Sequence, residues 1–83
     1  MKRTYLHQLA TTLSQLNTSS EVMTFLKGIL TPKEIEEISV RLQIVKQLKQ
    51  GVAQREIAEN LGVGIATVTR GSKELHKGNF KNV

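Results

Sequence analysis

The sequence contains no cysteine and no tryptophan, and its 83 residues include only one tyrosine, two phenylalanines and one proline. Without cysteine, the chain has neither a disulfide framework nor a thiolate metal site. With so few aromatic residues, aliphatic side chains must build the core. A core of that kind is small and gives little stability. Helical chains of this size are commonly stabilised by oligomerisation.

Long apolar runs are also missing, since no stretch approaches the roughly 20 apolar residues of a membrane span. The N-terminal stretch is basic at Lys2 and Arg3, but it has no long apolar segment and no small-residue cleavage site. A signal peptide is therefore not indicated, and we expect a cytoplasmic protein without membrane contact. The two histidines, His7 and His76, lack metal-ligand spacing, and the serines have no nearby acid–base partner. We expect no metal site, no catalytic residue and no enzymatic activity.

The charge of the chain is basic, with a formal net charge of +5 and a pI near 9.9. A basic surface favours polyanions, of which nucleic acid is the usual one. The cations gather towards the C-terminus, where the single acid Glu74 stands among Arg70, Lys73, Lys77 and Lys81. By contrast, the start of the central helix is acidic and suits the helix dipole, with Glu34, Glu36 and Glu37.

Helical periodicity covers most of the sequence, and no segment alternates with the period of a strand. Leucines at helical spacing predict a first helix, and Thr18 followed by Glu21 predicts the start of a second. Thr31, Pro32 and Glu34 together predict the N-terminus of a long scaffold helix over 31–50. One face of it is expected to be apolar and to contain Ile35, Ile38, Leu42, Val45 and Leu48.

Two shorter helices are expected at 54–60 and 65–75, after Gly51 ends the scaffold helix as a left-handed cap. The predicted fold class is all-α, with about five helices in a single domain over 1–83. Residues 1–30 are expected to form dimerisation helices, 31–50 the scaffold, 54–75 a helix-turn-helix and 76–83 a frayed or turned tail.

The segment 54–75 carries the strongest functional signal, because Ala58, Gly62 and Val68 fall at the spacings of a helix-turn-helix. Ala58 is small where the second helix crosses it, and Gly62 stands where the chain must adopt a positive φ. Such a unit places its second helix in the major groove of DNA. The angle between the helices is expected to depend on Val68, with Ile57, Leu61 and either Ile65 or Val63.

The exposed face of the second helix is small, polar and basic, as a DNA-reading surface would be. Its residues are Ala66, Thr67, Thr69, Arg70 and Lys73. A helical hairpin with a glycine turn, or a protein-binding module of the same shape, is the alternative. For Arg70 and Lys73 the alternative is a solvated face, but their position beside the reading surface favours phosphate contacts.

Several of these motifs resemble the bacterial Trp repressor superfamily over about residues 30–75. They are Leu30-Thr31-Pro32, Arg41, Gln54-Arg55-Glu56 and the run from Gly64 to Ser72. The resemblance implies an intertwined helical homodimer that represses transcription by binding a double-stranded DNA operator of two-fold symmetry. It assigns DNA contacts to Gln54, Arg55, Ile65, Ala66, Thr67 and Thr69, and it places Ala58 where the family has a lysine.

The resemblance also implies L-tryptophan as a corepressor between the scaffold and recognition helices. Arg70 would hold its carboxylate, and Arg41 and Arg70 would enclose its indole, as guanidinium chemistry allows. Thr31 and Gly71 match further pocket positions. Glu74 replaces a serine near the ligand's amino end, where a carboxylate could either pair with an ammonium or close the pocket.

Two kinds of function follow from these observations. The first is a sequence-specific DNA-binding regulator, either gated by L-tryptophan or independent of any ligand. The second is a helical small-molecule or protein-binding module with weak DNA affinity.

Overall fold

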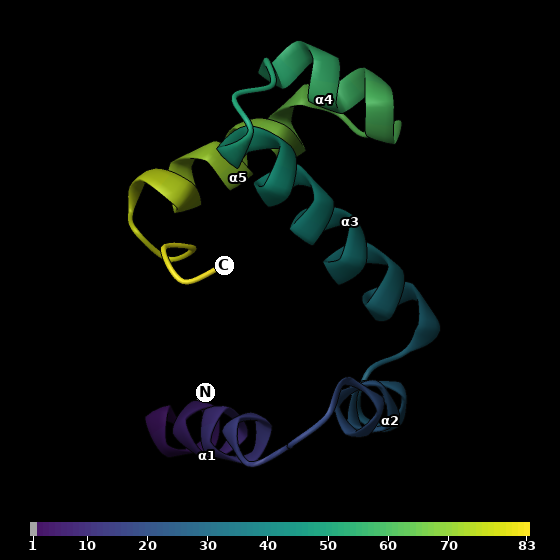
Figure 1. Ribbon diagram of the computed structural model, residues 1–83, viewed down its shortest axis with the longest axis vertical. Helices are drawn as coiled ribbons and strands as arrows, with labels where there is room; N and C mark the ends of the chain where they lie inside the picture. The colour runs from purple at the N-terminus through teal and green to yellow at the C-terminus, as the bar shows by residue number, and fades with distance from the viewer. Residues whose placement is uncertain (1) are drawn as a thin grey trace. The chain divides into compact units, whose positions relative to one another are not determined.

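The computed structural model describes residues 2–83, which form five α-helices and no β-strand (Figure 1). The helices are α1 (Arg3–Ser14), α2 (Ser19–Ile29), α3 (Pro32–Lys49), α4 (Gln54–Leu61) and α5 (Ile65–His76). The predicted all-α class is confirmed. The chain divides into two units, one that ends at Ile35 and one over Glu36–Val83. Within residues 2–83, no helix combines the length and the apolar character needed to cross a membrane.

The first unit contains α1 and α2, whose apolar side chains are largely uncovered. The capping pattern predicted for α2 is present, because the Thr18 hydroxyl accepts a hydrogen bond from the Glu21 N–H at 3.1 Å. Neither α1 nor α2 contributes a buried residue. Apolar side chains that are more than half exposed include Tyr5, Leu6, Met23 and Ile29.

The start of α3 is a capping box, as the sequence predicts. The Glu34 carboxylate accepts a hydrogen bond from the Thr31 N–H at 2.8 Å, and the Thr31 hydroxyl accepts one from the Glu34 N–H at 3.2 Å. Two interactions lower the pKa of the Glu34 carboxyl below its ordinary value. The larger is the hydrogen bond from the Thr31 N–H, and the next is the contact of the carboxyl with the Thr31 hydroxyl. The helix start is therefore stabilised by the ionised form of Glu34.

Replacing Thr31 with alanine should lower the free energy of unfolding by about 1 kcal/mol, because an orphan N–H of the first turn loses its acceptor. Urea denaturation followed by circular dichroism measures this loss.

Glu34→Gln provides a pH control. Since folding lowers the pKa of Glu34, the stability from its charge is present above the unfolded-state pKa and lost below the folded-state pKa. The difference between Glu34→Gln and wild type should therefore shrink as the pH falls below the ordinary glutamate pKa, and disappear below the lower pKa of the folded state. A difference that persists in acid would contradict this account.

The core of the second unit lies where α3, α4 and α5 meet, and it is formed by Ile44, Ile57 and Val68. The α3 residues in and around this core, Val40, Ile44 and Leu48, follow one another at intervals of four. On the apolar face predicted for this helix, Val45 is buried, whereas Ile38 and Leu42 are 47% and 41% exposed. Ile38 and Leu42 lie on α3 beside the row of Val40, Ile44 and Leu48 that packs in the core.

The three helices of this unit end in the same way, at a glycine with positive φ. The φ angles are +82° at Gly51, +64° at Gly62 and +89° at Gly78. After each glycine, the next N–H donates to the carbonyl five residues earlier, which satisfies an otherwise orphaned group. These bonds are Val52 to Gln47 at 3.1 Å, Val63 to Ala58 at 3.1 Å and Asn79 to Glu74 at 3.4 Å. The predicted conformations at Gly51 and Gly62 are confirmed, and the tail is turned.

Candidate functional site

Helices α4 and α5 form a compact pair joined by the turn 62–64. Ile57 of α4 and Val68 of α5 are both 0% exposed and share one cluster with Ile44 of α3. Of the two predicted alternatives, Val63 packs against this cluster, whereas Ile65 is 51% exposed. Two short helices locked in this way across a glycine-bearing turn are a helix-turn-helix unit.

Helix α5 lies very close to α3, and Gly71 makes that approach possible. A Cβ atom at Gly71 would come within 3.0 Å of the Ile44 Cγ2 atom. The glycine in the middle of α5 therefore allows the scaffold helix and the second helix of the unit to meet at short range. The direction in which α5 presents its exposed face depends on this contact.

The first turn of α5 presents a small, open surface. Ile65, Ala66 and Thr67 are exposed, and Gly64 before them provides no side-chain cap. Arg70 and Lys73 are exposed further along the same helix, and Arg55 is exposed on α4. Small side chains at a helix start allow the backbone to approach a flat or grooved partner closely. All of these predicted DNA-contact residues are accessible to a partner.

Gln54 and Thr69 are half-buried, and the structure brings them together. The Thr69 hydroxyl donates a hydrogen bond to the Gln54 Oε1 atom at 2.8 Å. This bond joins the start of α4 to the second turn of α5. Because the Gln54 oxygen is engaged, the amide N–H groups of the same side chain remain available as donors.

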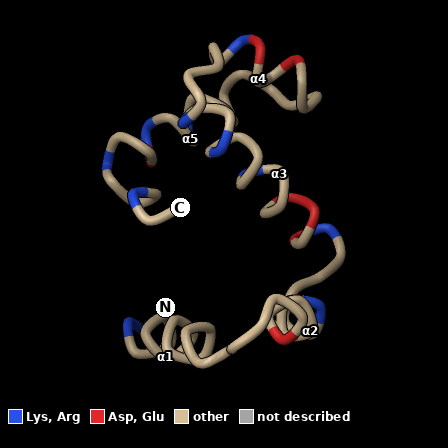
Figure 2. The backbone as a smooth tube through the Cα atoms, in the orientation of Figure 1, with Lys and Arg blue, Asp and Glu red and all other residues tan. Residues whose placement is uncertain are grey.

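The charges near this surface are unevenly distributed (Figure 2). Blue segments follow α5 and the tail, whereas the two acids of α4 are Glu56 and Glu59. The single acid of α5, Glu74, forms an ion pair with Lys77 at 3.2 Å. The remaining cations of α5, Arg70 and Lys73, lie on its exposed side without a second acid on that helix.

A pocket of about 520 Å³ lies between α3, α5 and the tail. Its volume is within the range of small-molecule sites. Four of the residues predicted to bind a ligand line it: Arg41, Arg70, Gly71 and Glu74. The fifth, Thr31, belongs to the first unit, where it caps α3. The other lining residues are Ile44, Val45, Ala66, Thr67, Asn79 and Phe80.

The lining combines cations with apolar surface. Arg41 and Arg70 provide guanidinium groups, and Ile44, Val45 and Phe80 provide aliphatic and aromatic contacts. Guanidinium groups pair with carboxylates and stack on aromatic faces. The pocket can therefore accommodate a small planar molecule that carries a carboxylate. For residues 2–83, no group of histidine, aspartate and glutamate side chains could hold a metal ion.

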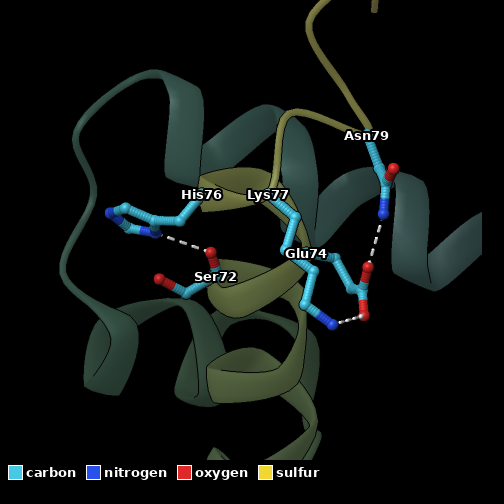
Figure 3. Close-up of polar contacts among 5 residues, drawn as sticks. All are labelled: Ser72, Glu74, His76, Lys77 and Asn79. Atoms are coloured by element: carbon cyan, nitrogen blue, oxygen red, sulfur yellow. Dashed lines mark hydrogen bonds and ion pairs between the residues drawn. The ribbon is translucent and has the colours of Figure 1, made fainter.

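Glu74 is held towards the tail at the edge of the pocket (Figure 3). Its Oε2 atom accepts a hydrogen bond from the Asn79 amide at 2.6 Å, and its Oε1 atom accepts one from the Lys77 ammonium at 3.2 Å. The Asn79 bond, followed by the contact with Lys77, lowers the pKa of the Glu74 carboxyl. The carboxylate is thus ionised and has a partner at each oxygen.

Sequence reasoning missed the two residues that the tail contributes to the pocket, Asn79 and Phe80, because it treated the tail as a separate segment. The signal that could have found them is Gly78, which follows the last helix as Gly51 and Gly62 follow theirs. A left-handed glycine at that position predicts a reversal of the chain. The reversal brings Asn79 back to Glu74.

The fold and the site define a class, that of small helical proteins with a C-terminal helix-turn-helix. A family model described as Trp repressor protein matches residues 4–82. The chain belongs to the Trp repressor protein family, which is a family of regulators.

Curated relatives named Trp operon repressor homolog are similar to part of the chain. The protein from Vibrio cholerae serotype O1 is 54% identical over 48 residues, which are 57% of this chain and 47% of the relative. The protein from Photobacterium profundum is 53% identical over 51 residues, or 60% of this chain and 50% of the relative. The matched part of the chain thus spans about half the length of these relatives.

Proposed function

We propose that this chain is a sequence-specific DNA-binding regulator that represses transcription in the cytoplasm. The observation that carries the proposal is the α4–α5 unit, whose second helix begins with the exposed residues Ile65, Ala66 and Thr67. Arg55, Arg70 and Lys73 provide cations beside that run for phosphate contacts. The family relationship supports the same function, since relatives are named Trp operon repressor homolog.

The regulator acts, in this proposal, as a homodimer on an operator of two-fold symmetry. The uncovered apolar faces of α1, α2 and the first half of α3 support it, because single chains rarely leave such surface open. Leu6, Leu9 and Leu13 on α1 are all exposed. A single chain of 83 residues has only a small core. A second copy that covered these faces would enlarge that core.

L-Tryptophan is the proposed corepressor, and the pocket beside α5 is its proposed site. Arg41 and Arg70 would bind its carboxylate and stack on its indole. Because Arg70 and Thr67 line the pocket and also lie on the exposed side of α5, a bound ligand would contact the helix that reads DNA. A regulator that binds DNA without a ligand is the alternative form of the same function.

Binding to fragments of the source genome tests the proposal. At low salt, with and without L-tryptophan, we expect protection of a discrete site with two similar half-sites. Half-sites for a two-fold dimer lie about one helical turn apart, or a multiple of that distance. Protection that needs L-tryptophan would support gating. A complete lack of protection under both conditions would contradict DNA regulation.

Thr69→Val should weaken binding to the specific site by about 1 kcal/mol or more, the scale of a base contact or of a lost hydrogen bond. The substitution preserves shape but removes the hydroxyl that holds Gln54. Thr69→Ser is the matched control, since it keeps the hydroxyl and should retain most of the affinity. Competition assays with specific and random duplexes measure the DNA affinities of both variants. An equal loss on random DNA would show that Thr69 has no part in sequence recognition.

A second candidate function is favoured by the pocket itself, namely a small-molecule-binding module with weak DNA affinity. Its lining joins two arginines to an aromatic side chain, Phe80, within one unit of the chain. Calorimetry with L-tryptophan distinguishes the candidates. Heat that vanishes in Arg70→Ala, together with no protected DNA fragment, would favour the module over the regulator.

A further inference from the structure

The last residues of the chain, 77–83, form a segment that returns to the pocket; it is called the C-terminal strap below. Gly78 turns the chain at the end of α5, with φ +89° and an N–H that donates to the Leu75 carbonyl at 3.0 Å. The strap then places Asn79 and Phe80 in the lining of the pocket, where Phe80 is half-buried. Figure 1 shows this yellow end of the chain curling back after α5.

The strap is anchored to both helices that line the pocket. On the α5 side, the Asn79 amide donates to Glu74 at 2.6 Å. On the α3 side, the Lys49 ammonium donates to the backbone carbonyls of Phe80 and Val83. Anchors at both ends give the strap a defined position across one side of the pocket.

The anchor on Glu74 occupies the group that a cationic ligand would need. Among the described residues that line the pocket, Glu74 is the only one with a carboxylate. Asn79 binds its Oε2 atom and Lys77 binds its Oε1 atom, and both partners belong to the strap (Figure 3). A ligand carboxylate meets Arg41 and Arg70 directly, but a ligand ammonium meets a carboxylate that already accepts one hydrogen bond at each oxygen and is turned towards the strap.

We propose that the C-terminal strap is an autoinhibitory gate, in which Asn79 and Lys77 compete with the ammonium of an aromatic amino acid for Glu74. Such a ligand binds fully only when it displaces Asn79, and the displacement releases the strap from α5. An aromatic carboxylate without an ammonium leaves the strap in place. The inference rests on the ligand pocket of the proposed function and is independent of DNA binding.

Calorimetry on the full chain tests the competition with two probes, L-tryptophan and indole-3-propionate, of which only the first carries an ammonium. Asn79→Ala should raise the affinity for L-tryptophan by about 3- to 10-fold, the scale of one polar contact to a charged group near the surface. The affinity for indole-3-propionate should change less than about 2-fold. Asn60→Ala is the matched control, because Asn60 makes a hydrogen bond to Gln47 outside the pocket lining, and it should alter neither affinity.

Trypsin cleavage after Lys77 and Lys81 reports the position of the strap without reference to affinity. L-Tryptophan should accelerate this cleavage in the wild-type protein, whereas indole-3-propionate should leave it unchanged. Lys49→Met, which removes the anchor on α3, should accelerate it without any ligand. These rates also detect a folding defect, because a misfolded variant is cut throughout the chain.

Equal affinity gains for both probes, or no gain for L-tryptophan, would overturn the gate. An absence of L-tryptophan binding in both wild type and Asn79→Ala would overturn it too, because the strap would not be what excludes the ligand. DNA binding, measured separately, can fail without changing any of these results. The failure of the gate and the failure of the DNA-binding proposal are therefore distinguishable.

Discussion

Ile57→Ala should lower the free energy of unfolding by about 2–5 kcal/mol, the range measured for large-to-small changes in cores. Ile57 is 0% exposed and lies in one cluster with Ile44 and Val68. Because so few residues of this unit are fully buried, the cavity has little surrounding core to fill it. Urea denaturation followed by circular dichroism measures the loss, which is a large fraction of the stability of a small domain.

The matched control is Ile65→Ala, the same substitution at a side chain that is 51% exposed. It should change the free energy of unfolding by no more than about 0.5 kcal/mol. If the start of α5 contacts DNA, the control should instead weaken DNA binding. Equal destabilisation by the two variants would contradict the packing described for the α4–α5 unit.

Affinity for the operator should fall roughly a thousand-fold between about 50 and 200 mM salt. Arg55, Arg70 and Lys73 are the exposed lysine and arginine residues of the α4–α5 unit. Two such units in a dimer would neutralise about six phosphates, which gives a slope near −5 in a plot of log affinity against log salt concentration. Fluorescence anisotropy with a labelled operator duplex measures that slope.

Lys73→Ala tests the assignment of these cations. Loss of one phosphate contact from each of two units should make the slope shallower by about 1.8, and loss from a single unit by about 0.9. Lys27→Ala is the control of equal charge, since Lys27 lies on α2 in the first unit. An unchanged slope in Lys73→Ala, or an equal change in Lys27→Ala, would remove α5 from the DNA interface.

Features that depend on a few neighbouring residues could be predicted from the sequence. The capping box at Thr31 and Glu34 spans four positions, and the structure shows both of its hydrogen bonds. The positive φ angles at Gly51 and Gly62 follow from a helix end and the need to reverse the chain. The pairing of Ile57 with Val68 follows from the spacing of the helix-turn-helix.

Features that depend on distant residues could not be predicted in the same way. Apolar periodicity on the scaffold helix marks a broad stripe, but it does not say which row meets another helix, and Ile44 was missed. The contacts of Lys49 with the strap join residues more than 30 positions apart and involve backbone carbonyls, which carry no sequence signal. The hydrogen bond between Glu74 and Asn79 likewise depends on the reversal of the chain at Gly78, which brings the two side chains together.

Gly78, the left-handed glycine at the end of α5, lies between the exposed side chains of that helix and the tail residues that line the pocket. Gly78 turns the chain through backbone bonds, so the reversal itself does not depend on the side chains in the first turn of α5. Beyond the turn, Glu74 and Lys49 hold residues 79–83 in place. Substitutions after Gly78 can therefore reshape the edge of the pocket while the exposed face at Ile65, Ala66 and Thr67 stays the same. Under the proposed function, such substitutions would change which ligand the pocket prefers and leave unchanged the residues proposed to contact DNA.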